Sequence, residues 1–206
     1  MAKISTYPSD SNITTNDMLI GTDSENSNET KNFSVGDIIN LAHSTVSENL
    51  PKGSFYDSVT QTLTGGANVA VPVILRSTDN DATSGISIVT DGTNLTRITF
   101  ANAGVYNILF SAQLANSGGT SQTVDFWLRK NGSTAAANIP STNGKVLLQG
   151  NANYLMAAWN YFVKVEANDY IQLMWTATST NITMVYDAAT AVHPATPSVI
   201  LTANIV

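Results

Sequence analysis

Few residues of this sequence are of the types that perform catalysis or hold metal ions, and those few are scattered. The chain of 206 residues contains two histidines, His43 and His193, and no cysteine. Neither histidine stands in a motif, and the absence of cysteine removes thiolate metal sites, cysteine nucleophiles and disulfides. A zinc site or a Ser-His-Asp triad would depend on residues that only the fold brings together. We therefore predict no metal site and no cofactor.

Carboxylates are the next group that could carry chemistry, but their sequence contexts favour structural roles. Paired carboxylates for glycoside hydrolysis are possible in principle among Asp125, Glu166, Asp169 and Asp187. Asp169 is better explained as a turn residue, and Glu166 as a solvated one. Residues 79–81, Asp-Asn-Asp, lack the glycine and the bidentate glutamate that complete a calcium loop. We expect a protein that is not an enzyme.

Aromatic residues form the third group, and they allow two interpretations. They could line a sugar-stacking surface, or they could form the core and a subunit interface. We prefer the second interpretation, because these residues occupy alternating positions of strand-like segments and not loops. The set comprises Tyr106, Phe110, Phe126, Trp127, Trp159, Tyr161, Phe162, Tyr170 and Trp175.

Composition and charge exclude two classes of partner. Charged residues make up 12% of the chain, against roughly 25% in an ordinary soluble domain. The formal net charge is -6, and the few basic residues stand singly, so a basic face for nucleic acid is not expected. The longest apolar runs are too short for a membrane span. Seven acidic and two basic residues precede Pro51, which marks residues 1–50 as a module distinct from residues 51–206.

The elements that must position these residues are mainly β-strands, and residues 154–175 give the clearest pattern. Trp159 and Tyr161 alternate with Asn160 and Phe162, which is the period of a strand. Residues 166–169 supply a turn, so we predict a β-hairpin. Residues 170–176 are apolar on both faces, which calls for cover by a lid or by a neighbouring subunit.

The rest of the chain after residue 54 repeats this alternation of short strands and turns. Pro72 stands inside one strand-like run, where it predicts a sheet edge or a bulge. Short strands at this spacing predict an all-β domain, a jelly-roll β-sandwich, over residues 51–206. The strand-like segments are residues 55–63, 69–76, 85–90, 95–100, 104–114, 123–129, 145–149, 154–165, 170–176, 180–185 and 198–205.

Residues 1–50 predict a small module of two short strands and one helix. The strands are expected at residues 18–22 and 30–35, and Ser34 and Asp37 resemble a capping box that opens the helix. One apolar stripe then runs down the helix. The stripe either packs on the following domain or forms a parallel bundle with the helices of sister chains. It consists of Val35, Ile38, Ile39, Ala42, Val46 and Leu50.

Two stretches of the larger domain resemble a known family. Residues 95–132, with Phe100, Gly104-Val105-Tyr106 and the later Lys130-Asn131-Gly132, resemble the jelly roll of the tumour necrosis factor and complement globular-head class. Residues 165–173 are similar to the late hairpin of that class, and residues 197–206 suit its last strand. Domains of this appearance recur in bacteriophage virion proteins. The resemblance implies a homotrimer.

Residues 4–42 resemble the short leader at the start of many phage tail-fibre and other virion proteins. The carrying features are an Asp-x-Leu-Ile-Gly-Thr-Asp strand, a Lys-Asn-Phe-Ser return strand and a Val-Gly-Asp-Ile helix start. The resemblance implies a non-enzymatic phage structural protein, a trimeric fibre, knob or capsid-decoration protein. Residues 1–50 would attach it to other virion proteins, and the head would project outward.

The sequence leaves the head's own partner open, because its distal loops could bind a host-surface glycan or protein or only cover the particle. No apolar signal segment follows the first residues, so we expect a virion protein made in the host cytoplasm. The alternative is a soluble sugar-binding or ligand-binding jelly roll unrelated to virions. The expected oligomer-interface residues are Val35, Ile38, Ile39, Ala42, Val46, Tyr106, Phe110, Trp159, Tyr161 and Trp175.

Overall fold

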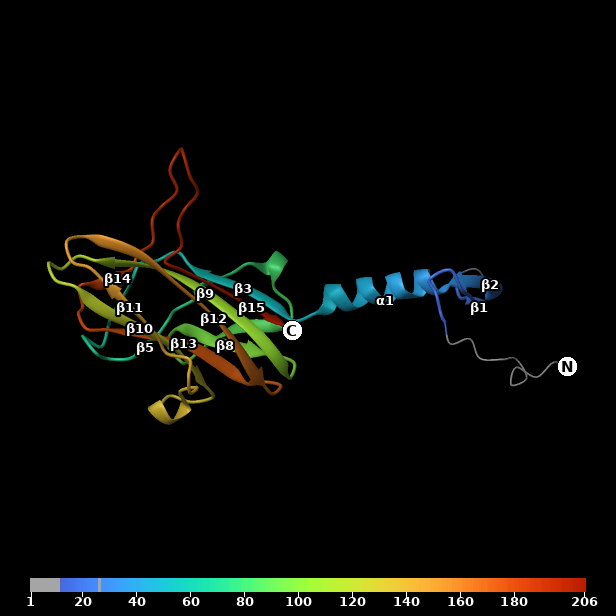
Figure 1. The fold of residues 1–206 in the computed structure, drawn as a ribbon, viewed down its shortest axis with the longest axis horizontal. Coiled ribbons are helices and arrows are strands. Elements are labelled where there is room, and N and C mark those ends of the chain that lie inside the picture. Colours follow the sequence, from blue (N-terminus) through green and yellow to red (C-terminus); the bar gives the residue numbers. More distant parts are fainter. Residues whose placement is uncertain (1–11, 26) are drawn as a thin grey trace. The chain divides into compact units, whose positions relative to one another are not determined.

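The computed structural model describes residues 12–25 and 27–206, and the side chains of these residues except those of residues 44–49 (Figure 1). The chain divides into two compact units, Met1–Asn49 and Leu50–Val206. The first holds a two-stranded sheet and a helix, and the second holds two antiparallel sheets. The predicted all-β class is therefore confirmed, with a jelly-roll head and an N-terminal segment of short strands and one helix.

The N-terminal unit forms the predicted elements. Strand β1 (Met18–Asp23) pairs antiparallel with β2 (Glu29–Ser34), and an ion pair of 2.7 Å joins Lys31 Nζ to Asp23 Oδ2. Helix α1 (Val35–Asn49) follows at once. The backbone N–H of Asp37 donates to Ser34 Oγ at 3.0 Å, and that hydroxyl donates to Asp37 Oδ2 at 2.6 Å. The predicted cap is thus confirmed.

This unit contains no buried side chain among those the structure describes. Within residues 12–25 and 27–43, every apolar side chain is exposed or half-buried, and seven large ones are more than two-fifths exposed. No described helix is long and apolar enough to cross a membrane. The unit therefore presents apolar surface without a core of its own. The exposed large side chains are Ile13, Met18, Leu19, Ile20, Ile38, Ile39 and Leu41.

The head is a sandwich of a six-stranded and a seven-stranded sheet (Figure 1). In the six-stranded sheet the order is β11-β10-β13-β8-β7, and β5 also pairs with β13. Its strands are β5 (Val71–Pro72), β7 (Ile86–Thr90), β8 (Leu95–Phe100), β10 (Gln122–Lys130), β11 (Gly144–Leu148) and β13 (Tyr170–Ala177).

In the seven-stranded sheet the order is β4-β14-β9-β15-β3-β6, and β12 pairs with β9. Two short 3-10 helices, η2 (Asn80–Ala82) and η3 (Ala135–Ala137), lie in connecting loops. The strands of this sheet are β3 (Lys52–Asp57), β4 (Gln61–Thr62), β6 (Ser77–Thr78), β9 (Gly104–Asn116), β12 (Asn153–Val165), β14 (Ile182–Met184) and β15 (Val199–Ile205).

The core lies between the two sheets and is rich in aromatic side chains. Alternate residues of each strand point inward, as the burial of every second residue of β9 shows. Phe126 stands between Phe110 and Trp175, with ring centroids 5.0 and 6.3 Å away. Such contacts add to the area that each ring buries. The largest fully buried side chains are Trp175, Tyr106, Phe55, Phe100, Phe110 and Phe126.

The predicted hairpin at residues 154–175 is wrong, because its two strands belong to different sheets. Strand β12 pairs with β9 along its whole length, whereas β13 pairs with β10. The turn itself is as predicted: Asn168 has φ 68, and Asp169 Oδ2 accepts from the Glu166 N–H at 2.7 Å. It carries the chain from one sheet to the other. Alternation identifies a strand and its faces, but it does not identify the strand's neighbour.

The strand-like segments 55–63 and 69–76 are interrupted by a buried polar cluster. Gln61 donates to Asp57 Oδ2 at 2.7 Å and exchanges hydrogen bonds of 2.8 and 2.9 Å with the main chain of Ile74. Arg76 forms an ion pair with the same carboxylate. The Gln61 side chain therefore makes the hydrogen bonds with the Ile74 main chain that a neighbouring strand would otherwise make. Pro72 stands on β5, which pairs only with β13 among the described strands, as its edge prediction required.

Strand β13 is covered on both faces by its own chain. Five consecutive residues, 171–175, are buried in the single chain. On the face turned away from the core, Met174 lies in register between Trp127 and Pro72. The burial of residues 171–175 within the single chain shows that this strand does not need a sister subunit for cover.

Candidate functional site

Three of the expected interface residues lie in the sandwich core. Tyr106, Phe110 and Trp175 are at most 1% exposed and pack against other core side chains. They cannot contact a sister chain unless the head unpacks, so their predicted place in an oligomer interface is wrong. The pattern of alternation separates the two faces of a strand, but it does not tell which face turns inward.

Two further aromatic residues, Trp159 and Tyr161, also point inward but stand at an edge of the sandwich. They belong to β12, and their rings lie 5.6 and 6.3 Å from Phe110. Both are half-buried. Burial raises the pKa of Tyr161 to about 12, and its hydroxyl has no hydrogen-bond partner among the described residues. These rings close the side of the sandwich where β11 and β12 end the two sheets.

The helix residues of the expected interface are exposed where they are described. Ile38 and Ile39 are 43% and 51% exposed, Ala42 is exposed, and Val35 is half-buried. The side chain of Val46 lies outside the described residues. The stripe on α1 is therefore present as solvent-facing apolar surface.

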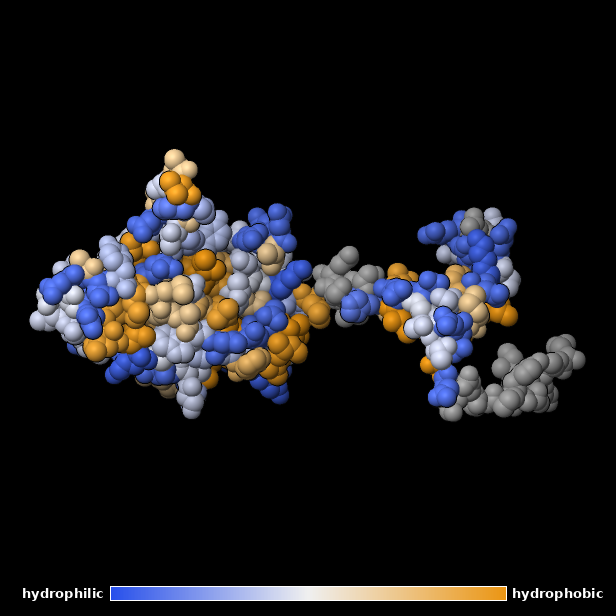
Figure 2. Space-filling view, turned by 45° about the horizontal axis from the view of Figure 1, so that its top comes forward, coloured by the Kyte–Doolittle hydropathy of each residue, from blue (hydrophilic) through white to orange (hydrophobic). Residues whose placement is uncertain are grey.

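A larger apolar surface lies on the seven-stranded sheet, on the face turned away from the core. We call it the outer sheet face. Register places Phe162 beside Asn107, and Leu109 beside Asn160 and Thr202, so apolar and polar residues are interspersed on β12, β9 and β15. Figure 2 shows apolar residues among polar ones on the surface of the head. The exposed apolar members are Val105 41%, Leu109 46%, Tyr154 70%, Met156 61%, Phe162 67% and Ile200 39%.

Strand β12 also leaves one backbone edge unpaired. It has 13 residues and pairs only with β9 among the described strands. A long unpaired edge is a template for association unless something covers it. The outer sheet face and this edge adjoin on β12, because Tyr154, Met156 and Phe162 belong to both. Sequence reasoning included Phe162 only in the general aromatic set and missed Tyr154 and Met156, although the alternation of residues 154–164 sets all three apart from the inward residues.

A second candidate site is a cavity of about 340 Å³ on the outward side of the six-stranded sheet. Strands β10 and β13 form its floor, and the segment after η3 forms its rim. Two hydrogen bonds hold that segment against β10: the Ile139 N–H donates to Leu128 O at 2.8 Å, and the Leu128 N–H donates to Thr142 Oγ1 at 3.1 Å. The cavity is lined by Asp125, Trp127, Asn138, Ile139, Ser141, Asn143 and Thr176.

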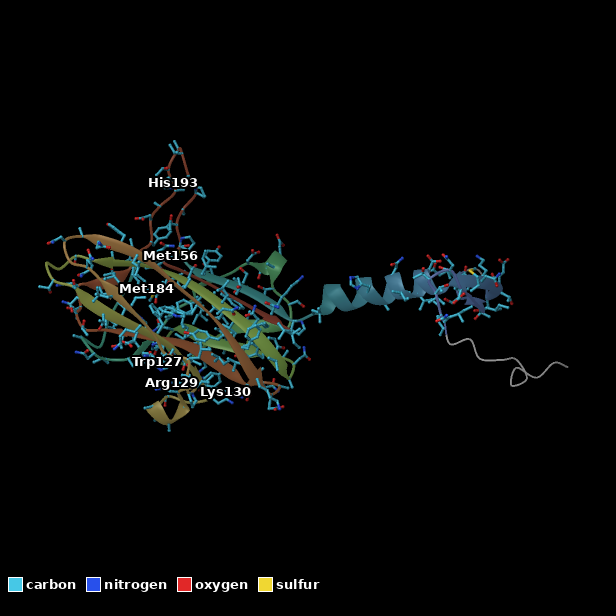
Figure 3. The ribbon with its side chains drawn as sticks, viewed as in Figure 1. Trp127, Arg129, Lys130, Met156, Met184 and His193 are labelled. Carbon is cyan, nitrogen blue, oxygen red and sulfur yellow. The ribbon has the colours of Figure 1, made fainter. Side chains whose placement is uncertain are left out.

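The polar groups of this cavity are held in place by one another. Asn138 Oδ1 accepts from Trp127 Nε1 at 2.9 Å and from Arg129 Nε at 3.2 Å. Burial lowers the pKa of Arg129. Asp125 Oδ1 accepts from Asn143 Nδ2 at 2.9 Å, and Lys145 Nζ lies 3.6 Å from it. Figure 3 shows Trp127 and Arg129 close to the loop that contains η3.

The residues considered for catalysis or metal binding do not come together. His43 lies on α1, and His193 lies on the loop that projects between β14 and β15 (Figure 3). No group of three His, Cys, Asp or Glu side chains suited to a metal ion occurs within residues 12–25 and 27–206. Asp79 and Asp81 are exposed.

Asp169 has the structural role expected of it. Its Oδ2 accepts from the Glu166 N–H and lies 2.6 Å from Lys130 Nζ, and its Oδ1 accepts from Asn131 Nδ2 at 2.6 Å. The hydrogen bond from Lys130 is the main cause that lowers the pKa of Asp169 to about 2. Glu166 is exposed, as predicted. The Asp169 carboxylate and its donors stabilise the turn between the two sheets.

No protein-family model matches the chain, and no curated protein matches it. Among solved structures, the one described as Eiger TNF from S. frugiperda is similar over 77% of this chain and 93% of that chain. The TM-score is 0.48 and the sequence identity is 10%. At this identity the likeness is one of fold alone.

Proposed function

We propose that the chain is the subunit of a homotrimeric bacteriophage virion protein, a short fibre, knob or capsid-decoration protein. The observation that carries this proposal is the outer sheet face, where six large apolar side chains are between 39% and 70% exposed on neighbouring strands of one chain. Exposed apolar surface of this extent marks a contact with another protein. The partner we assign is a sister copy of the head.

The trimer is favoured by the arrangement of two different surfaces on one subunit. The unpaired edge of β12 and the broad face formed by β9, β15 and β3 are distinct, so an edge-to-face contact between copies is heterologous. Heterologous contacts close into a ring when the rotation between neighbouring copies is a whole fraction of a full turn. The resemblance of residues 95–132 to the tumour necrosis factor class supports three subunits in that ring.

The virion assignment is supported by the N-terminal unit. Its strand-strand-helix order follows the leader pattern of phage fibre proteins, and its described side chains form no buried core. A unit of this size cannot offset the entropy of its own ordering without further contacts. It gains those contacts from other virion proteins and from sister helices, and the head then projects from the particle. The chain has no catalytic role and is made in the host cytoplasm.

The cavity beside Trp127 favours one alternative, a soluble sugar-binding jelly roll unrelated to virions. Under that alternative the N-terminal unit is dispensable. Mass spectrometry of particles purified from a lysate of the cells that carry the gene separates the two functions. The virion assignment requires the chain in those particles at a copy number divisible by three. Its absence from purified particles, with the chain present in the soluble fraction, would overturn the assignment.

A further inference from the structure

We propose that the cavity on β10 and β13 binds a neutral pyranose sugar, with Trp127 as the stacking surface. This goes beyond the subunit role, and it holds for a single head as well as for a trimer. The cavity volume of about 340 Å³ falls at the lower end of the roughly 300–1,000 Å³ of small-molecule sites. Its lining combines one indole with carboxylate, amide and hydroxyl groups.

The indole is fixed in the way that a stacking surface requires. Trp127 lies on the outward side of β10, and its Nε1 donates to Asn138 Oδ1 at 2.9 Å. That bond uses the only polar group of the ring, so the remaining indole surface is apolar. A pyranose presents C–H groups on one side of its ring, and these bury favourably against an aromatic face.

Two polar groups of the cavity retain hydrogen-bonding capacity of opposite kinds. Asp125 Oδ1 is used by Asn143, and no described residue donates to Asp125 Oδ2. Asn138 Oδ1 accepts two donors, and its Nδ2 has no acceptor among the described residues. A sugar hydroxyl both donates and accepts, so it can satisfy a carboxylate oxygen and an amide N–H.

The rim contains a residue held in an unfavourable backbone conformation. Ser141 has φ 63 and directly follows Pro140. A proline followed by a positive φ is the arrangement in which glycine is the usual choice. Holding serine there keeps a hydroxyl on the rim at a conformational cost, and such outliers gather at binding sites. The Ser141 hydroxyl has no hydrogen-bond partner among the described residues and is available to a ligand.

The charge of the cavity selects a neutral ligand. Its only ionised lining residue is Asp125, whose charge is offset by Lys145 at 3.6 Å. No lysine or arginine lines the cavity, so phosphates and acidic sugars lack a cationic partner. The cavity and the outer sheet face lie on different sheets of the sandwich, with their surfaces turned away from the core in opposite directions. Trimer formation through the outer sheet face therefore leaves the cavity open.

The test is saturation-transfer NMR with the full chain and the methyl pyranosides of glucose, galactose, mannose and N-acetylglucosamine. A methyl sialoside is the charged contrast. We expect saturable binding of at least one neutral sugar and none of the sialoside. Asp125→Asn should weaken that binding roughly tenfold or more, because a hydrogen bond to a charged group is lost. The matched control is Asp81→Asn, which makes the same charge change at an exposed site and should leave affinity unchanged.

Two further variants separate binding from folding. Trp127→Ala should abolish binding, with circular dichroism as the check that the head remains folded. If that variant does not fold, Ser141→Gly decides: glycine suits φ 63, so the melting temperature should not fall, while sugar binding weakens. No saturable binding of any of the four neutral sugars overturns the proposal, and so does unchanged affinity in Asp125→Asn and Ser141→Gly.

The same samples distinguish this proposal from the subunit role. If the chain binds a neutral sugar but is a monomer, the cavity proposal stands and the trimer proposal fails. If the chain is a trimer but binds no neutral sugar, the trimer proposal stands and the cavity proposal fails.

Discussion

Phe162 offers the sharpest test of the outer sheet face. It lies on the unpaired edge strand β12, points away from the core and is 67% exposed in the single chain. Truncation to alanine removes an exposed side chain and leaves the core of the head intact. Phe162→Ala should therefore weaken association between heads without lowering the stability of each head.

The size of the effect follows from area. A phenylalanine side chain buries roughly 200 Å², and truncation of its exposed part removes about 100 Å² from the interface. At ~25 cal/mol per Å² this is about 2.5 kcal/mol per copy, or about 7.5 kcal/mol for three copies. Since ~1.4 kcal/mol is tenfold, the trimer constant falls by roughly 10⁵. Even a loss of one third of this free energy would raise the protein concentration at half-association about eightfold, because that concentration varies with the square root of the trimer constant.

The assay is sedimentation velocity over a dilution series of the full chain. Leu147 provides the matched control, because it is 62% exposed but lies on β11 of the other sheet. Leu147→Ala should associate as the unchanged chain does. Equal association of Phe162→Ala and the unchanged chain across the series would refute the assignment of the outer sheet face, and loss of association in Leu147→Ala alone would move the interface to the other sheet.

Three predictions concern stability. Asp169, whose pKa is lowered to about 2 mainly by Lys130, stabilises the head at pH values above the ordinary aspartate pKa of about 3.9; that contribution is lost as pH falls towards 2, so urea midpoints of the unchanged chain and Asp169→Asn should converge at low pH. Gly150→Ala should lower the melting temperature because its Cβ would collide with the backbone of Gly119, whereas Gly119→Ala meets no atom and serves as the control. Ser34→Ala should cost α1 about 1 kcal/mol and speed amide exchange in its first turn.

Local features of the fold could be predicted from the sequence because neighbouring residues determine them. Ser34 and Asp37 stand three residues apart, and Ser34 caps the helix as expected, with its hydroxyl bonded to both the backbone N–H and the carboxylate of Asp37. The faces of β12 follow directly from the alternation, with Val163 inside and Phe162 outside. Asn168 takes the left-handed conformation that its residue type favours in a turn.

Features that depend on strand partners could not be predicted. Residues 154–175 read as a hairpin because a short turn usually joins paired strands, yet β12 finds its partner in β9, some 50 residues earlier in the chain. The core aromatics were assigned to an interface for the same reason, since only the packing of the second sheet decides which face is inside. Tyr106 illustrates this, because it is 0% exposed.

The candidate cavity could not be found from the sequence because its parts are distant in the chain. Asp125 and Trp127 lie on β10, Ser141 lies on a later loop, and Thr176 lies on β13. Trp127 was noted among the aromatic residues but did not stand apart from those that fill the core. Pro140 marks a turn in the sequence, but only the structure shows that Ser141 takes a positive φ.

The measurement that tests the central claim most directly is the solution mass of the full chain and of the Leu50–Val206 unit, by light scattering after gel filtration. The account predicts three chain masses for both, because the outer sheet face and the edge of β12 belong to the head. A head that is monomeric at the highest soluble concentration, while the full chain is trimeric, would contradict the account and assign trimerisation to the N-terminal unit. Two monomers would contradict the homotrimer altogether.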